Sequence, residues 1–152
     1  KNPNRNLFRK SNLSKYNTSR KSEILKCKQC DKPVRSNKKI YCSVECCKLY
    51  EYESYISKWK SGEITGLDKT TGCVVPTVKR YLMKKFDNKC SVCNWGKINP
   101  FTNKVPLVAD HIDGNHLNNL EENLRIICWN CDSLGNTFGA RNRGNGRKNR
   151  KR

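Results

Sequence analysis

The sequence predicts a small α+β protein stabilised by zinc, in which a zinc finger precedes a second zinc-containing α+β domain. The 152 residues include ten cysteines, and eight of these form four closely spaced pairs. Only 35% of the residues are hydrophobic, which is little apolar material for a large core, and small domains of this kind commonly depend on metals. The paired spacing beside Lys- and Arg-rich sequence favours metal ligands in a reducing cytoplasm over secreted disulfides.

The charge of the chain points to a polyanionic partner. The formal net charge is +19 at pH 7 and the sequence pI is about 9.7. Nucleic acid is the expected partner. We expect no membrane association, because no apolar run has transmembrane length and no basic helix has a wide apolar face. The basic first residues also lack the apolar stretch of a signal peptide, so a cytoplasmic location is expected.

The N-terminal part is expected to hold a basic arm and then a zinc finger. Residues 1–22 are rich in Lys, Arg, Asn and Ser and predict a flexible arm, either a solvated tail or a segment that orders along DNA phosphates. The zinc finger and its helix are expected over residues 23–62, with Ser43 as the helix N-cap. Cys46 is favoured as the last ligand, with Cys47 as the alternative. The expected ligands of this first zinc are Cys27, Cys30, Cys42 and Cys46.

The helix of the finger is followed by an expected linker. Tyr52, Ile56 and Trp59 fall at helical spacing on one face, which favours packing over base stacking. Residues 63–74 predict the linker between the two domains, because they contain glycines and a polar turn-like stretch. Cys73 has no partner at ligand spacing and is expected to bind no metal.

The second domain is expected over residues 75–140 and begins with a helix over 75–86. Pro76 suits the first turn of that helix. The apolar run at 105–108 predicts a strand that leads into Asp110 and His111, and residues 124–127 predict the return strand. A short helix is expected from about Asp132. The expected ligands of the second zinc are Cys90, Cys93, Cys128 and Cys131.

This last half of the chain resembles the HNH, or ββα-metal, endonuclease family in the zinc-knuckle form common in phages. The resemblance rests on Asp110 and His111 at the end of one strand and on Asn123 at the start of the next. Asp132 directly follows a cysteine, where the family usually carries His or Asn, and the signature continues through residues 139–144. The resemblance implies a ββα-metal fold for the second domain and the chemistry of phosphodiester hydrolysis.

The resemblance also implies a role for each site residue. His111 is the expected general base, since a histidine accepts a proton near neutral pH. Asp110 and Asp132 are the expected ligands of one catalytic ion, and two carboxylates favour Mg²⁺ or Mn²⁺. Asp113 is the alternative ligand. Asn123 is expected to fix the loop that carries His111 by hydrogen bonds to the backbone.

Basic residues are expected to hold the DNA. The tail over residues 141–152 is almost wholly Arg, Lys, Asn and Gly with no acidic residue, and is expected to be flexible and to add affinity. The individual side chains expected to contact DNA are Lys79, Arg80, Arg125, Arg141 and Arg143.

The expected function is that of a phage or homing HNH endonuclease that nicks one DNA strand as a monomer. A weak dimer would cut both strands. Larger phage assembly partners fit this class of protein, and so does a location in a bacterial or phage-infected cell. The alternatives are a non-catalytic zinc-finger protein that binds nucleic acid and a structural zinc protein of a ribonucleoprotein. Asp110, His111 and Asn123 discriminate against both, because binding alone does not require them.

Overall fold

The structure is a computed structural model that describes residues 25–34 and 39–144. The predicted arm over residues 1–22 and most of the predicted tail over 141–152 lie outside the described residues. The chain divides into two compact units, Lys1–Leu49 and Tyr50–Arg152. The division therefore falls within the helix after the first cysteines, and not in the expected linker over 63–74.

The first unit is built around a tight loop of four cysteines. Cys27 donates its backbone N–H to Lys32 O at 2.9 Å, and an isolated β-bridge joins Lys26 to Pro33. The first described helix, α2 (Val44–Lys60), begins in this unit. The Oγ of Ser43 accepts a hydrogen bond from the N–H of Cys46 at 3.2 Å, which confirms Ser43 as the N-cap.

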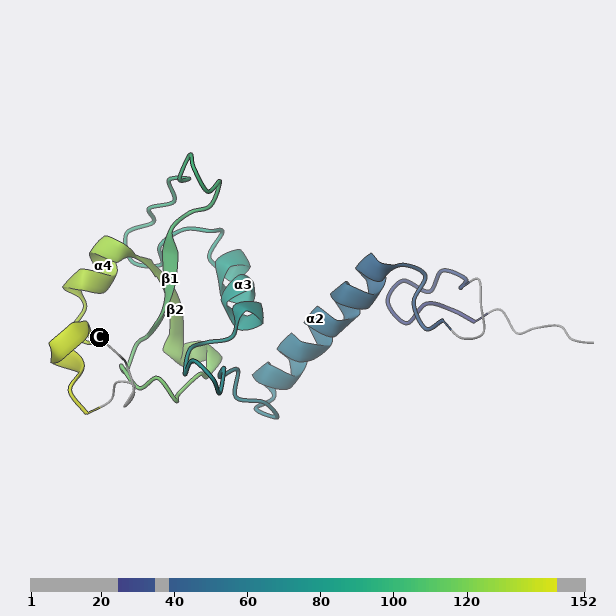
Figure 1. The fold of residues 1–152 in the computed structure, drawn as a ribbon, viewed down its shortest axis with the longest axis horizontal. Coiled ribbons are helices and arrows are strands. Elements are labelled where there is room, and N and C mark those ends of the chain that lie inside the picture. The colour runs from purple at the N-terminus through teal and green to yellow at the C-terminus, as the bar shows by residue number, and fades with distance from the viewer. Residues whose placement is uncertain (1–24, 35–38, 145–152) are drawn as a thin grey trace, which may run out of the picture. The chain divides into compact units, whose positions relative to one another are not determined.

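The second unit contains the end of α2 and a small α+β arrangement (Figure 1). A two-stranded antiparallel sheet lies between two helices, and short 3-10 turns flank its second strand and its second helix. The predicted small α+β class is thereby confirmed. The elements are α3 (Pro76–Lys85), β1 (Leu107–His111), η2 (Glu121–Asn123), β2 (Leu124–Cys128), α4 (Trp129–Leu134) and η3 (Gly139–Asn142).

The register of the sheet sets the positions of the candidate site residues. Asp110 lies opposite Arg125, and His111 lies opposite Leu124. Because successive side chains of a strand project to opposite faces, Asp110 and His111 leave β1 on different sides of the sheet. Figure 1 shows α3 and α4 on opposite sides of the two strands.

The core of the second unit is formed by α3, the strands and the end of α2. Val78 and Leu82 of α3 and Ile126 of β2 are fully buried, and Ile56 and Trp59 of α2 join the same cluster. The predicted packing role of the α2 apolar face is confirmed, which explains why the second unit starts within α2. These side chains remove apolar surface from water on folding and so stabilise the unit.

Two local predictions differ from the structure. Helix α4 begins at Trp129 and not near Asp132, because the extended backbone of Cys128 ends β2 directly before the helix. Residues 63–74 form an ordered loop and not a plain linker. The N–H of Val75, directly after this loop, donates to Gly66 O at 2.9 Å, and a Cβ on Gly66 would lie 2.9 Å from the Trp59 indole.

Among the described residues, no helix is both long enough and apolar enough to cross a membrane.

Candidate zinc clusters and nuclease site

The first four expected zinc ligands lie together in the first unit. The sulfur atoms of Cys27, Cys30, Cys42 and Cys46 are within 4.8 Å of one another, and the group does not include Cys47. The distances are 3.5 Å from Cys30 to Cys42 and 3.6 Å from Cys30 to Cys46. Four sulfurs at about 2.3 Å from a tetrahedral zinc lie about 3.8 Å from each other, so the cluster fits the ion.

A second cluster stands at the end of the sheet in the second unit. The sulfur atoms of Cys90, Cys93, Cys128 and Cys131 also lie within 4.8 Å of one another, and Cys93 and Cys128 are 3.7 Å apart. Cys128 is the last residue of β2 and Cys131 lies in α4. A zinc ion here would join the loop before β1 to the junction between β2 and α4.

The titration of the cysteines is consistent with metal ligands. Burial opposes ionisation of Cys90, but backbone N–H groups, first that of Cys93, lower the pKa of this thiol to about 6. A hydrogen bond with Cys93 raises the pKa of Cys131 to about 12. One thiol of the cluster therefore ionises readily because backbone N–H groups stabilise its thiolate, while another holds its proton in a hydrogen bond to a neighbouring sulfur. A bound cation would favour the thiolate form of all four cysteines and release the remaining protons.

His111 ends β1 beside a buried asparagine. Its Nε2 atom lies 2.8 Å from the Oδ1 of Asn119, and Asn119 is only 4% exposed. The backbone carbonyl of Asn119 accepts a hydrogen bond from the indole Nε1 of Trp59 at 2.8 Å. The loop that holds His111 is thereby tied to the end of α2.

Asn123 joins the two ends of the loop between the strands. Its Nδ2 donates to Asn118 O and to the Oδ1 of Asp113, both at 2.8 Å, and its Oδ1 accepts from the N–H of Asp113 at 3.1 Å. The Nδ2 of Asn118 donates to the other Asp113 oxygen at 2.7 Å. Burial opposes ionisation of Asp113, but the hydrogen bonds from Asn118 and Asn123 lower the pKa of this carboxyl. Asp113 therefore takes part in the hydrogen bonding of the loop.

Asp110 forms an ion pair across the sheet. The Nε of Arg125 donates to the Oδ2 of Asp110 at 2.8 Å, and both side chains are largely shielded from solvent. The cross-strand register explains this pair, since opposite residues of an antiparallel sheet share a face.

The third expected metal residue lies in another element. Asp132 is in the first turn of α4, a helix that packs against both strands. Among the described residues, groups of three or more His, Cys, Asp or Glu ligand atoms within 4.8 Å are formed only by the two cysteine clusters. Asp110, His111 and Asp132 are not gathered into such a group.

The basic residues that are expected to contact DNA have different local environments. The Arg80 guanidinium stacks over the ring of Tyr52 with 4.2 Å to the ring centroid. The Nη2 of Arg141 donates to Ser133 O at 2.6 Å. Lys79 is half-buried in α3, and Arg143 is exposed after η3.

The segment after α4 returns to the loop beyond β1. The Nδ2 of Asn142 donates to Gly114 O at 2.8 Å. A Cβ on Gly114 would lie 2.5 Å from the Oδ1 of Asn142 and 2.8 Å from the Cγ2 of Thr137. Gly114 has a φ of +75°, a conformation that favours glycine. The absence of a side chain at Gly114 therefore permits this close approach.

Sequence reasoning missed Asn119 and Asn142 as residues that hold the His111 loop. Both are ordinary polar residues in asparagine-rich sequence; Asn119 falls in no motif, and Asn142 lies in the signature over residues 139–144 without an assigned role. Their partners are separated along the chain, Trp59 from Asn119 by 60 residues and Gly114 from Asn142 by 28. A signal for such contacts arises only from the folded arrangement.

Comparison with known proteins gives a partial match. A stretch of 57 residues is 39% identical to the H-N-H endonuclease F-TflIV of Escherichia phage T5. It covers 38% of the chain and 24% of the relative, so the matched stretch spans about a quarter of that protein's length. No protein-family model and no solved structure matches the chain. The partial similarity supports the resemblance to HNH endonucleases.

Proposed function

We propose that this protein is a metal-dependent HNH endonuclease that hydrolyses DNA phosphodiester bonds and nicks one strand as a monomer. The proposal rests on the placement of His111 at the end of β1, with Nε2 held 2.8 Å from the buried Asn119 amide oxygen. The partial similarity to a phage H-N-H endonuclease supports the same reaction class. Double-stranded DNA is the proposed substrate of this chain.

The amide orientation of Asn119 determines which nitrogen of His111 is basic. The Nδ2 of Asn119 donates to His116 O at 3.5 Å, so its Oδ1 faces His111 as an acceptor. The Nε2 of His111 then carries the proton, and Nδ1 has the free lone pair. In our proposal Nδ1 of His111 takes the proton from the attacking water.

Asp110 and Asp132 are the proposed ligands of a single Mg²⁺ or Mn²⁺ ion. Carboxylate oxygens on β1 and on α4 suit such hard cations, and α4 packs directly against β1. When bound, the ion supplies Lewis-acid stabilisation of the charge that develops on the phosphate and leaving oxygen. Arg125 holds the Asp110 carboxylate through the 2.8 Å ion pair, and Asn123 fixes the turn that follows His111.

Phosphate contacts are proposed for Lys79 and Arg80 of α3 and for Arg125, Arg141 and Arg143. The net charge of +19 supports a large electrostatic contribution to DNA binding. The two zinc ions are proposed to be structural. The protein would then carry three metal sites, of which one is catalytic. A cytoplasmic location and a phage or homing type of endonuclease are part of the same proposal.

A supercoiled-plasmid assay tests the proposal. The protein is incubated with Mg²⁺, with Mn²⁺ or with EDTA, and relaxed circles are expected only with a metal. Zinc content is measured after EDTA treatment, so that loss of structural zinc is not mistaken for loss of the catalytic ion. His111→Ala should reduce nicking by about 100-fold or more, the usual contribution of a general base.

His116→Ala is the matched control, because the chain contains two histidines and His116 lies in the loop that follows His111. It should retain nicking. Asp132→Ala should abolish metal-dependent cleavage, and intact cleavage would refute its role as a ligand. If wild-type and His111→Ala proteins retard the plasmid equally and neither relaxes it, the protein is a non-catalytic DNA-binding protein. A linear product would indicate a dimer or paired sites.

A further inference from the structure

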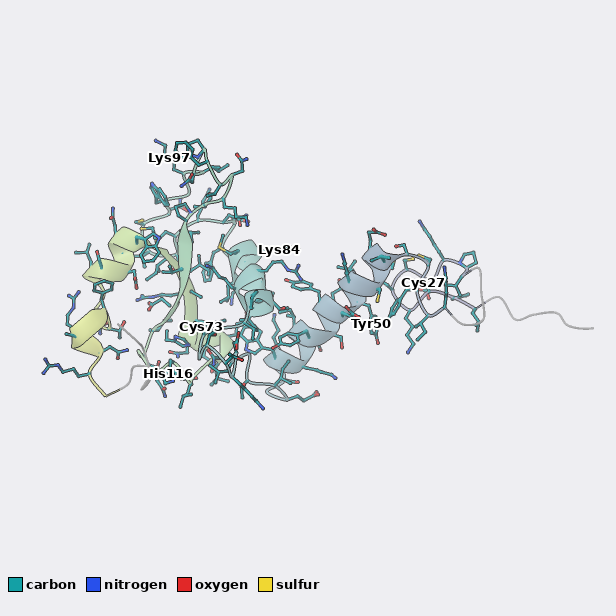
Figure 2. All side chains as sticks on the ribbon, viewed as in Figure 1. Cys27, Tyr50, Cys73, Lys84, Lys97 and His116 are labelled. Atoms are coloured by element: carbon teal, nitrogen blue, oxygen red, sulfur yellow. The ribbon has the colours of Figure 1, made fainter. Side chains whose placement is uncertain are left out.

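We infer that Phe101 is an apolar wedge that inserts against the bases of duplex DNA. This inference rests on the proposed DNA partner and adds a binding element outside the nuclease site. Phe101 stands at the tip of the turn over residues 99–104, between the second cysteine cluster and β1. Figure 2 shows Lys97 on the loop that extends beyond the ends of the two strands.

The aromatic ring is almost completely exposed. Phe101 has an exposed fraction of 93%, and the neighbouring Ile98 is 59% exposed. Trp95, at the base of the same loop, is 39% exposed. An isolated exposed apolar residue is common, but three exposed apolar residues in one loop favour a binding role for the loop.

The turn that carries Phe101 is fixed by hydrogen bonds to Asn99. The Oδ1 of Asn99 accepts from the N–H of Phe101 at 2.9 Å and from that of Thr102 at 3.3 Å. The backbone of Asn99 exchanges further hydrogen bonds with Asn103 and Lys104, each at 2.9 Å. Pro100 restricts the backbone between Asn99 and Phe101. The ring is therefore presented by an ordered turn, which lowers the entropy lost on binding.

The charges around the turn favour nucleic acid as the occupant. Lys89, Lys97 and Lys104 are all exposed, and no acidic residue occurs from Asn88 to Ala109. Lysines beside an exposed aromatic ring provide phosphate contacts next to a group that stacks on bases. Apolar wedges of this kind, Phe among them, enter base steps and unstack them.

The loop has anchors at both of its ends. It leaves the second cysteine cluster at Cys93 and returns to β1, the strand that ends at His111. A base step held by Phe101 would therefore be at a set separation from the scissile phosphate. In this way the wedge would position the duplex on the nuclease unit.

Duplex binding by Phe101→Ala tests the inference. The change is made in His111→Ala protein, so that binding is read without dependence on cleavage, and fluorescence anisotropy of a short labelled duplex is measured over a range of salt. We expect an affinity loss of about 5- to 100-fold, the usual effect of removing one base-stacking side chain. The slope of log affinity against log salt should stay unchanged, because no phosphate contact is removed.

Three further variants separate the wedge from other effects. Phe101→Trp should keep the affinity, and Thr102→Ala, whose side chain has no role in the proposal, is the matched control in the same turn. Lys97→Ala should lower the salt slope by about 0.9. In a duplex that contains 2-aminopurine, binding of protein that retains Phe101 should unstack the base and raise the 2-aminopurine fluorescence. Binding of Phe101→Ala protein should not.

Two results would overturn the wedge. The first is equal affinity of Phe101→Ala and its His111→Ala parent for duplex DNA. The second is a loss of binding of Phe101→Ala to anionic vesicles while its binding to DNA is unchanged. Failure of the nuclease proposal has a separate signature, namely absence of plasmid cleavage by the otherwise wild-type protein. Loss of duplex affinity in Phe101→Ala would then still support the wedge.

Discussion

The side chain of Asn119 accepts at 2.8 Å from the ring of His111, while its backbone carbonyl accepts from the indole of Trp59. One buried residue thus contacts both the proposed general base and the core. The two contacts use different atoms of Asn119, so substitution of its side chain removes the first contact and leaves the second. This separation permits a direct test of how His111 is oriented.

Asn119→Ala is expected to reduce nicking by about 10- to 100-fold, because a misoriented base transfers the proton poorly. Asn119→Asp keeps an oxygen at the same position and should retain more activity than Asn119→Ala. Plasmid nicking under saturating metal measures both. Equal rates for the wild-type and Asn119→Ala proteins would show that this contact does not position His111.

Gly114→Ala is expected to displace the segment that contains Thr137 and Asn142. The added Cβ would meet the Asn142 Oδ1 at 2.5 Å, in a backbone conformation with a φ of +75°. Strain and overpacking together should lower the free energy of unfolding by about 2–5 kcal/mol. Chemical denaturation measures the stability, and plasmid nicking should fall in parallel.

Gly139→Ala is the matched control for that substitution. Gly139 also has a positive φ, +57°, but nothing lies within 4 Å of the position of its Cβ. It should therefore show the backbone strain alone, about 1–2 kcal/mol. If the two variants were equally destabilised, the packing of Asn142 on Gly114 would contribute nothing.

The wild-type protein is expected to bind two zinc ions, one at each cysteine cluster. Cys90→Ser should lower the zinc content to about one and reduce the melting temperature by roughly 10 °C or more, because metal binding contributes to folding. Elemental analysis and a thermal melt measure the two effects. Cys47→Ser and Cys73→Ser lie outside both clusters and should keep two zinc ions.

Glu121 accepts a hydrogen bond from Tyr81 at 2.8 Å and pairs with Lys60 and Lys85. Burial opposes its ionisation, but the hydrogen bonds from Lys85 and Tyr81 lower the pKa of the Glu121 carboxyl below the usual 4.5. Since the folded state holds this carboxyl ionised, the resulting stability is complete above about pH 4.5 and is lost as the pH falls through the lowered pKa.

Glu121→Gln should therefore lower the free energy of unfolding by about 1 kcal/mol at pH 7, a modest value because both lysines are exposed. The difference from wild type should persist down to about pH 5 and shrink below 4.5. Denaturation with excess zinc at each pH measures it. A difference that grew on acidification would contradict the assigned sign.

Much of the second unit was predictable because short-range patterns determine it. Pro76 and the apolar spacing after it indicated α3, and the apolar runs at 105–108 and 124–127 indicated the two strands. Pair spacing indicated both cysteine clusters, since ligands three or four residues apart belong to one turn. These features depend on residues that are close in sequence.

The remaining features depend on distant contacts. The start of the second unit within α2 follows from the burial of Trp59 against residues later in the chain, and periodicity indicated a packed face without its partner. The Asp110–Arg125 pair requires the strand register, which the sequence leaves open. The spatial relation of Asp110 to Asp132 likewise depends on how α4 packs against β1.

The contact of Asn142 with Gly114 has a consequence for the order of events during protein synthesis. Asn142 is made 28 residues after Gly114, so the loop beyond His111 is synthesised before its last contact exists. A nascent chain that already contains Asp110, His111 and Asn123 would therefore lack the final constraint on this loop. In the proposed nuclease, activity would mature only after the segment that follows α4 has emerged.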